Sequence, residues 1–336
     1  MKRFLTTLLL FALVPANGFA WGYVGHSMIS RLAMENLPSS MPAFMRSPQA
    51  VDEITYMGPE EDRIKGAGQS WDEDNDEGHF LDIDDNHKIG GVIALDALPK
   101  DMAAYADALS KAGTTPYKMG FVPYTIMDGF ERARMDFALW RVADYLATHA
   151  ETPEKRAEQA RERDLREALT LRDIGDWGHF VGDGSQPLHI TIHYNGWGDY
   201  PNPKGYTTNH IHSLFETQTV DKYSKIEDVR KMMLAPSIPA ADHLLTQEEI
   251  GKMTGAYLGA SADEVAPLYD LYAAGGFTNG SKEAIDFTDL QLARGASMLR
   301  DLITLAWENS DYAKVGYPAL SVKDILDGKV APNSSD

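Results

Sequence analysis

The chain of 336 residues contains no cysteine, so it can form neither a disulfide bond nor a thiolate–metal bond. A protein without disulfides depends for its stability on its hydrophobic core or on bound metal ions. Hydrophobic residues make up 43% of the sequence, which is enough to bury a large core. Any metal site in this chain must therefore bind its ion without thiolate ligands.

Basic residues are scarce relative to acidic ones. Lys and Arg number 31 against 50 Asp and Glu, which gives a formal net charge of −19. Such a charge disfavours long-range attraction to nucleic acid and to anionic membranes. The mixed charges of residues 154–172 indicate a solvated helix face. Formal charge ignores bound cations, however, and carboxylates gathered around a metal ion are locally neutralised.

Long apolar runs are almost absent. One such run, residues 4–14, follows two basic residues and precedes the tripeptide GFA at positions 18–20. The run is too short to cross a bilayer, which needs about 20 apolar residues. The pattern predicts a secretory signal peptide over residues 1–20, with an uncleaved anchor as the alternative. We therefore expect a periplasmic or secreted protein that begins at Trp21 and has no stable membrane span.

Alternating strand patterns are also scarce, whereas helical periodicity is common. Apolar residues recur at steps of three and four in Met135–Leu146 and in Leu292–Ala306. Thr288 or Asp289 is the expected N-cap of the second helix. Clusters of Gly, Pro and Asn predict loops at 66–77, 88–99, 112–123, 194–208 and 274–281. The sequence predicts a mainly α fold in a single domain with long loops.

The stretch GHFVGDGSQPLH, residues 178–189, has a ligand-like pattern. His179 and Asp183 are four residues apart, which places both side chains on one face of a helix. Gly184 and Pro187 end that helix, and His189 follows the turn. The stretch TTNHIHSLFE adds a second pair with the same spacing, His212 and Glu216.

One His-x-x-x-acid pair is more often a surface or capping feature than a metal site. Two pairs with a third His indicate a metal site, because imidazole nitrogen and carboxylate oxygen are ligands that Zn²⁺ prefers. The stretch WGYVGH extends this pattern, because it would place Trp21 at the mature N-terminus and His26 five residues later. A free α-amine has a pKa of about 8, so its neutral form can bind metal together with the Trp21 carbonyl.

The stretches WGYVGH, HFLD, HFVGDGSQPLH and NHIHSLFE resemble the metal motifs of the trinuclear zinc phosphodiesterase superfamily. That superfamily contains the fungal and plant single-strand-specific nucleases and the bacterial zinc-dependent phospholipases C. The motifs lie within residues 21–216. The resemblance implies a helical bundle of this type over residues 21–310, a C-terminal tail over 311–336, and three Zn²⁺ ions.

The resemblance also implies a ligand set. It assigns Trp21 and His26 to one zinc ion, His79 and His179 to a second, Asp183 to a bridge between these two, and His189, His212 and Glu216 to the third. One more acidic ligand is expected between the first two motifs. Asp62 is the best match, because the basic residue Lys65 follows three positions later, and Glu60 and Glu61 compete with it.

The mechanism implied by the resemblance is hydrolysis of a phosphodiester by a hydroxide that two zinc ions share. The third ion would stabilise the charge that develops on a phosphate oxygen. Asp62 would be the catalytic carboxylate, which orients the attacking water or accepts its proton. The products would be a phosphomonoester and an alcohol.

The substrate is left open between single-stranded nucleic acid and phospholipid. The WGYVGH spacing, the long gap from His189 to His212, and HFLD resemble the nucleases, in which Phe80 would stack on a base and Asp82 would bond it. Phe80 could equally be a core aromatic. Glu216 as the last ligand, GDGSQPLH and the lack of cysteine resemble the phospholipases C. We favour a nuclease, with phospholipase C as the alternative.

Two further expectations concern the rest of the chain. His79 and His179 are much farther apart than in the family pattern, so residues 85–130 are an insertion that either shapes the cleft or elaborates the surface. We expect a monomer. A secreted zinc-binding protein without activity is a less favoured alternative, because His189, His212 and Glu216 leave a position open for water or substrate, as catalytic zinc sites do.

Overall fold

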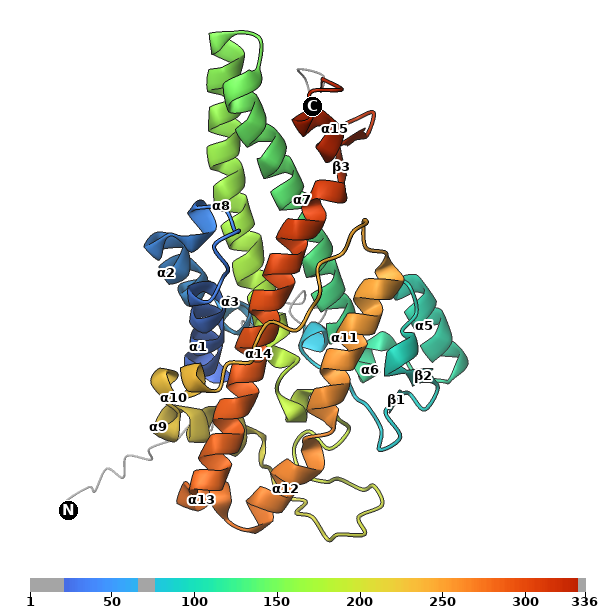
Figure 1. Ribbon diagram of the computed structural model, residues 1–336. Coiled ribbons are helices and arrows are strands. Elements are labelled where there is room, and N and C mark those ends of the chain that lie inside the picture. The colour runs from blue at the N-terminus through green and yellow to red at the C-terminus, as the bar shows by residue number, and fades with distance from the viewer. Residues whose placement is uncertain (1–20, 66–75, 332–336) are drawn as a thin grey trace, which may run out of the picture.

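The computed structural model describes residues 21–65 and 76–331. Four helices form the frame of the protein in this part of the chain. They are α1 (Gly22–Glu35), α7 (Val122–His149), α8 (Pro153–Asp183) and α14 (Lys282–Asn309). Figure 1 shows α7 and α8 as a long antiparallel pair, with α14 running beside it. The fold is mainly helical, as predicted. The expected signal peptide lies outside the described residues.

The remaining elements are shorter than α7, α8 and α14. The other helices are α2 (Pro48–Met57), α3 (Glu60–Ile64), α5 (Met102–Lys111), α6 (Pro116–Met119), α9 (Val220–Tyr223), α10 (Ile226–Lys231), α11 (Gln247–Ala262), α12 (Val265–Ala273), α13 (Gly276–Asn279) and α15 (Val322–Leu326). Strands β1 (Lys88–Ile89) and β2 (Ile93–Ala94) pair antiparallel, as do β3 (Lys314–Val315) and β4 (Leu320–Ser321). None of the helices in the described ranges combines the length and apolar character needed to cross a bilayer.

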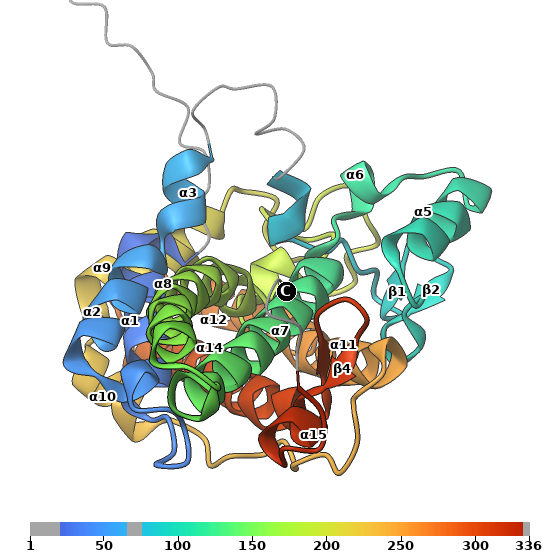
Figure 2. The ribbon, with the colours of Figure 1, turned by 90° about the horizontal axis from the view of Figure 1, so that it is seen from above.

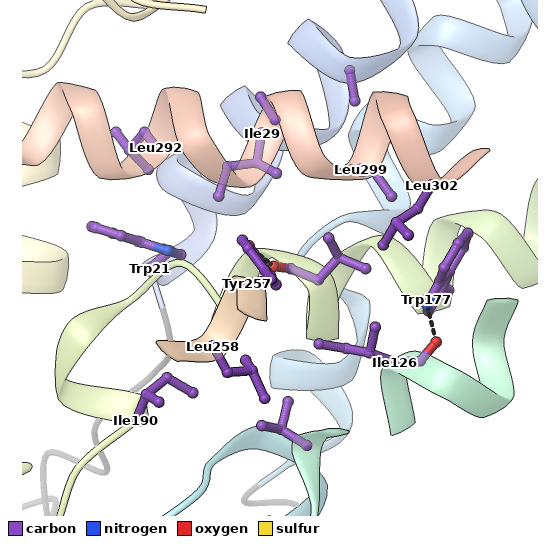
Figure 3. Close-up of a cluster of buried hydrophobic side chains, with 14 of the residues drawn as sticks. Trp21, Ile29, Ile126, Trp177, Ile190, Tyr257, Leu258, Leu292, Leu299 and Leu302 are labelled. Atoms are coloured by element: carbon purple, nitrogen blue, oxygen red, sulfur yellow. Dashed lines mark hydrogen bonds between the residues drawn. The ribbon is translucent and has the colours of Figure 1, made fainter. Parts of the chain in front are cut away.

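Helix α8 delivers one of the predicted ligand pairs. It begins after Thr152, whose hydroxyl accepts a hydrogen bond from the Lys155 amide, and it ends at Asp183 with Gly184 as its C-cap. The predicted end of this helix is therefore confirmed. Close packing against α7 fixes its C-terminal half, because the Trp177 indole donates to the Ile126 carbonyl at 2.9 Å (Figure 3).

The predicted N-cap of α14 is wrong. The helix begins at Lys282, and the Ser281 hydroxyl accepts a hydrogen bond from the Ala284 amide. Thr288 lies inside the helix, where its buried hydroxyl donates to the Ala284 carbonyl at 2.8 Å. A Thr can satisfy its hydroxyl in this way without ending a helix, so its presence before an apolar run was an ambiguous signal.

Trp21 belongs to the main core. Its fully buried ring lies in the same cluster as Ile29, Leu292 and Tyr257 (Figure 3). The indole nitrogen donates to the Gly182 carbonyl at 3.0 Å, just before the end of α8. The start of α1 is thereby attached to the C-terminal turn of α8, and the two predicted ligand motifs meet.

The predicted insertion and the predicted tail both contain regular structure. Residues 85–121 form the β1–β2 hairpin, α5 and α6, which project together from one side of the frame (Figure 2). Residues 314–326 form the β3–β4 hairpin and α15. Val315, Val322 and Ile325 pack there on Ala138 and Val142 of α7, in a second small apolar cluster.

Candidate metal centre

The first ligand group lies where α1 meets the end of α8. His26, His179 and Asp183 are fully buried and present ligand atoms close to one another. The Nε2 atoms of both His residues lie 3.5 Å from Asp183, each from a different carboxylate oxygen. The two imidazole rings stack with their centroids 3.9 Å apart. Asp183 therefore stands between two imidazoles, as a bridging ligand would.

The second group adds Asp62 and His79 to His179. Asp62 is buried on α3, with its carboxylate oxygens 3.8 Å from His179 Nε2 and 4.0 Å from His26 Nε2. Of the three competing acids, Asp62 is thus the one that faces the cluster. Glu60 instead pairs with Arg63 on the protein surface. Glu61 lines a different cavity together with Asp176 of α8.

The third group contains His189, His212 and Glu216. Glu216 is fully buried, and its Oε2 lies 2.9 Å from His212 Nε2 and 3.6 Å from His189 Nε2. His212 and Glu216 keep their predicted four-residue spacing, although Leu214–Thr219 has π-helical rather than α-helical geometry. His189 Nδ1 also lies 3.7 Å from Asp183, so this group adjoins the first.

Backbone carbonyls orient the imidazole rings. The Nδ1 atoms of His179, His189 and His212 lie 2.8–2.9 Å from the carbonyls of Gly58, His79 and Tyr194, respectively. A carbonyl can only accept a hydrogen bond, so each Nδ1 carries the proton and each Nε2 is left with a lone pair. All three Nε2 atoms face the carboxylates. This is the arrangement by which proteins prepare His as a metal ligand.

Most carboxylate oxygens of the cluster lack a hydrogen-bond donor within the described chain, and Lys65 offsets only part of the charge of Asp62 and Asp183. Both oxygens of Asp62 and Asp183 and one of Glu216 are buried without a hydrogen-bond partner among the described residues. Burial raises the pKa of Asp62 to about 8 and raises that of Asp183 well above its usual range. Burial also lowers the pKa of His179 to about 3. Bound cations would neutralise these carboxylates and use the lone pairs of the neutral imidazoles.

The residues present therefore fit bound metal ions. Three buried groups of His, Asp and Glu could hold metal ions, and the first two groups share His179. Their nitrogen and oxygen donors are of the kinds that Zn²⁺ accepts, whereas Mg²⁺ and Ca²⁺ prefer oxygen donors alone. Every His, Asp and Glu that the resemblance implied as a ligand belongs to one of these groups.

Trp21 lies beside the cluster because its indole bonds to Gly182 and Ser185. Its carbonyl accepts a hydrogen bond from the Gly25 amide at 3.1 Å, in the first turn of α1. A carbonyl has a second lone pair, so this bond leaves it able to bind a metal ion as well. The role of the α-amine depends on cleavage after Ala20, which lies outside the described residues.

A protein that retains one additional Met before Trp21 is expected to lose most of its activity. The amide that replaces the α-amine has no lone pair for a metal ion, so one ligand disappears. We expect at least a tenfold lower kcat/KM, in line with the loss of a metal-site group. Metal analysis of both proteins would accompany the rate measurement. Full activity of the Met-Trp21 form would contradict the N-terminal ligand model.

A cavity of about 630 Å³ opens beside the third ligand group. Its wall includes the ligands His79, His189 and His212. The other lining residues supply aromatic rings, amides and cations: Lys65, Phe80, Asp82, Lys118, Leu188, Tyr194, Asn195, His210, Ser213, Leu214 and Gln218. The cluster is thus accessible from a pocket of ordinary ligand-binding size.

Both residues predicted to bind substrate line this cavity. Phe80 is partly exposed there and is not part of the hydrophobic core. Asp82 is partly buried, and burial raises the pKa of its carboxyl to about 7. At neutral pH this carboxyl can therefore either accept or donate a hydrogen bond.

Lys65 is a pocket residue whose role was not predicted from the sequence. It follows α3 and is largely buried, with its ammonium 2.9 Å from Asp76 Oδ1. Burial lowers the pKa of this ammonium, but Asp76, and then Asp62 and Asp183, together raise it above its usual value. Its spacing of three residues from Asp62 was the available signal in the sequence.

Gly120 is expected to be essential for the position of Phe80. Its backbone has φ 74°, and a Cβ there would lie 2.1 Å from the Phe80 carbonyl oxygen. We expect Gly120→Ala to lower the free energy of unfolding by about 2 kcal/mol or more, because strain and a backbone clash add. Urea unfolding would measure it, with Gly113→Ala as control. Gly113 also has positive φ but no atom near its Cβ, so a similar loss in both variants would refute the clash.

No family model, curated protein or solved structure matches this chain.

Proposed function

We propose that the protein is an exported trizinc phosphodiesterase that hydrolyses single-stranded DNA or RNA. One observation supports this above all: the motif residues, which lie far apart in the sequence, form three adjoining buried ligand groups beside an open pocket. A closed structural zinc site would have four protein ligands and no substrate cavity. The pocket therefore favours catalysis over a purely structural role for the metal.

The residues of the site would have distinct roles in the reaction. The three ligand groups hold the metal ions, and Asp183 lies between two of the imidazoles. When bound, zinc supplies Lewis acidity and lowers the pKa of water toward neutrality. Asp62 presents a carboxylate at the cluster that can accept a proton from the attacking water. The Lys65 ammonium, which lines the pocket, adds positive charge for a phosphate.

The pocket wall supplies the features for binding a base. Phe80 and Tyr194 present aromatic rings, and Asp82 and Asn195 present polar groups that can bond the edge of a base. Stacking on one aromatic contributes about 1–3 kcal/mol and tolerates any base. Because stacking and edge bonding both need an unpaired base, these residues favour a single-stranded substrate.

A paired assay tests the proposal. The mature, zinc-loaded protein would be given single-stranded DNA, single-stranded RNA and a phosphatidylcholine analogue, each with and without a chelator. We expect chelator-sensitive cleavage of the nucleic acids. Release of phosphocholine alone would establish the phospholipase C alternative, and zinc binding without turnover of any substrate would establish a non-catalytic protein.

A substitution at Phe80 tests whether the pocket binds the base of the substrate. Phe80→Ala should lower kcat/KM on single-stranded DNA by about 10- to 100-fold through loss of stacking, with unchanged zinc content. Phe44→Ala serves as control, because Phe44 packs against Trp140 and not in the pocket. Equal effects of the two substitutions would argue against base stacking at Phe80.

A further inference from the structure

The segment formed by residues 85–121 contributes Lys118 to the lining of the pocket. Backbone hydrogen bonds fix its last turn to the segment that carries His79. The Asp82 amide donates to the Met119 carbonyl at 2.7 Å, and the Val122 amide donates to the Phe80 carbonyl at 3.2 Å. Helix α6 is thus held beside the two residues proposed to bind a base, and its Lys118 lines the cavity.

Lys118 differs from Lys65, the other lysine of the pocket. Lys65 is largely buried and pairs with Asp76. Lys118 is exposed, and no hydrogen bond or ion pair of its ammonium occurs within the part of the chain that the structure describes. In a protein with a net charge of −19, an unpaired ammonium at the mouth of a pocket is unusual. It gives this rim a local attraction for anions that the whole surface lacks.

The position of Lys118 suits a phosphate other than the one being cleaved. Asp82, whose amide is bonded to Met119, lies three residues beyond the ligand His79. Lys118 precedes Met119, so this backbone pairing holds it next to Asp82, three residues along the chain from the ligand His79 and in the same pocket. A base held by Phe80 and Asp82 would direct the phosphate at its other end toward Lys118. A choline head group offers a cation there, which Lys118 would repel.

We propose that Lys118 binds the phosphate that neighbours the scissile one in a nucleic-acid strand. The segment 85–121 thereby makes the site prefer substrates with consecutive phosphates over those with a single phosphodiester. This inference rests on the proposed nuclease function and specifies its substrate further.

Small substrates test the inference directly. A dinucleoside monophosphate, NpN, would be compared with pNpN and NpNp, which carry one additional terminal phosphate at either end. We expect a kcat/KM about tenfold higher for one of the phosphorylated forms, mainly through KM. Lys118→Ala should remove this advantage and leave cleavage of NpN unchanged, whereas Lys118→Arg should retain it. Lys111→Ala is the matched control, because Lys111 is exposed on α5 of the same segment and already pairs with Asp107 at 2.5 Å.

A binding measurement gives a readout that does not depend on turnover. The affinity for a phosphorothioate oligonucleotide would be measured at several salt concentrations. Loss of one phosphate contact should reduce the slope of log affinity against log salt by about 0.7 in Lys118→Ala. Lys111→Ala should keep the wild-type slope.

The possible outcomes distinguish a wrong role for Lys118 from a wrong nuclease proposal. Wild-type cleavage of NpN with no advantage for pNpN or NpNp, or an advantage that survives Lys118→Ala, would overturn the role of Lys118 and leave the nuclease proposal intact. Cleavage of the phosphatidylcholine analogue without cleavage of any nucleotide would overturn both. Loss of NpN cleavage in Lys118→Ala would also overturn the inference, because Lys118 would then act on the scissile phosphate.

Discussion

Replacement of Asp183 by Asn is expected to lower the phosphodiesterase kcat/KM on the order of a thousandfold. Asp183 lies 3.5 Å from both His26 and His179 and 3.7 Å from His189, so it contacts three imidazoles of the cluster. Asn keeps the shape of the side chain but removes the negative charge that two cations would share. The loss affects metal affinity and the charge balance of the transition state together.

The same substitution should have the opposite effect on the metal-free protein. Burial, and then repulsion by Asp62, raises the pKa of Asp183 well above its usual range, which shows that the site disfavours its charge. Asn removes that cost. We therefore expect metal-free Asp183→Asn to unfold at the same or a higher temperature than metal-free wild type at pH 8, whereas the zinc-loaded variant should unfold at a lower one.

Thermal unfolding with and without zinc measures both effects, alongside zinc content and kcat/KM. Asp176→Asn is the matched control, because Asp176 lies two turns earlier on α8 and outside the ligand groups. An Asp183→Asn variant with wild-type activity and zinc content would refute Asp183 as a ligand. Equal destabilisation in the metal-free and zinc-loaded states would mean that Asp183 serves packing alone.

Removal of metal from the wild-type protein is expected to cause a large drop in its unfolding temperature, Tm. A metal ion present at 100 times its dissociation constant stabilises the folded state by about 2.7 kcal/mol, and three groups are present to hold metal. In domains of comparable size each kcal/mol shifts Tm by about 2–4 °C. We therefore expect chelation to lower Tm by about 10 °C or more.

The size of this drop should depend on pH in a defined direction. Burial raises the pKa of Asp62 from 3.8 to about 8 in the metal-free fold. Between these values the folded protein binds more protons than the unfolded chain, so the stability of the metal-free protein falls as pH rises. Zinc takes the place of those protons, and its affinity increases with pH. The difference in Tm between zinc-loaded and chelated protein should therefore widen from pH 6 to pH 8.5.

Thermal unfolding at these two pH values provides the measurement. Readdition of Zn²⁺ should restore Tm, whereas Mg²⁺ should not, because Mg²⁺ prefers an octahedral shell of oxygens to imidazole. A difference in Tm that narrows toward pH 8.5 would contradict the buried carboxylates as the source of the effect.

The predictions that were correct concern local patterns. His179 and Asp183 share a helix face because four residues make about one turn, and Gly184 ends that helix as expected. His212 and Glu216 also face each other, although their segment is π-helical. The N-cap of α14 failed for the same local reason, because Thr288 could satisfy its hydroxyl within the helix as well as at its end.

The residues that escaped prediction depend on contacts between distant segments. The carbonyls of Gly58 and Tyr194 orient two imidazoles, yet no side-chain pattern marks a carbonyl that does so. The pocket position of Lys118 depends on the pairing of residues 119–122 with Phe80 and Asp82. In the sequence it is one lysine in a stretch that predicts a loop.

The sequence by itself determined the spacing of the ligands along single helices, because helical geometry is local, and the absence of cysteine excluded thiolate ligands. Tertiary structure decided which acid among Glu60, Glu61 and Asp62 joins the cluster, and that Phe80, Asp82 and Lys118 share one pocket. Those outcomes follow from the packing of α1, α3 and α8 and from backbone pairing across the insertion. The choice of acidic ligand and the lining of the pocket therefore depend on contacts between elements far apart in the chain, which residue spacing does not reveal.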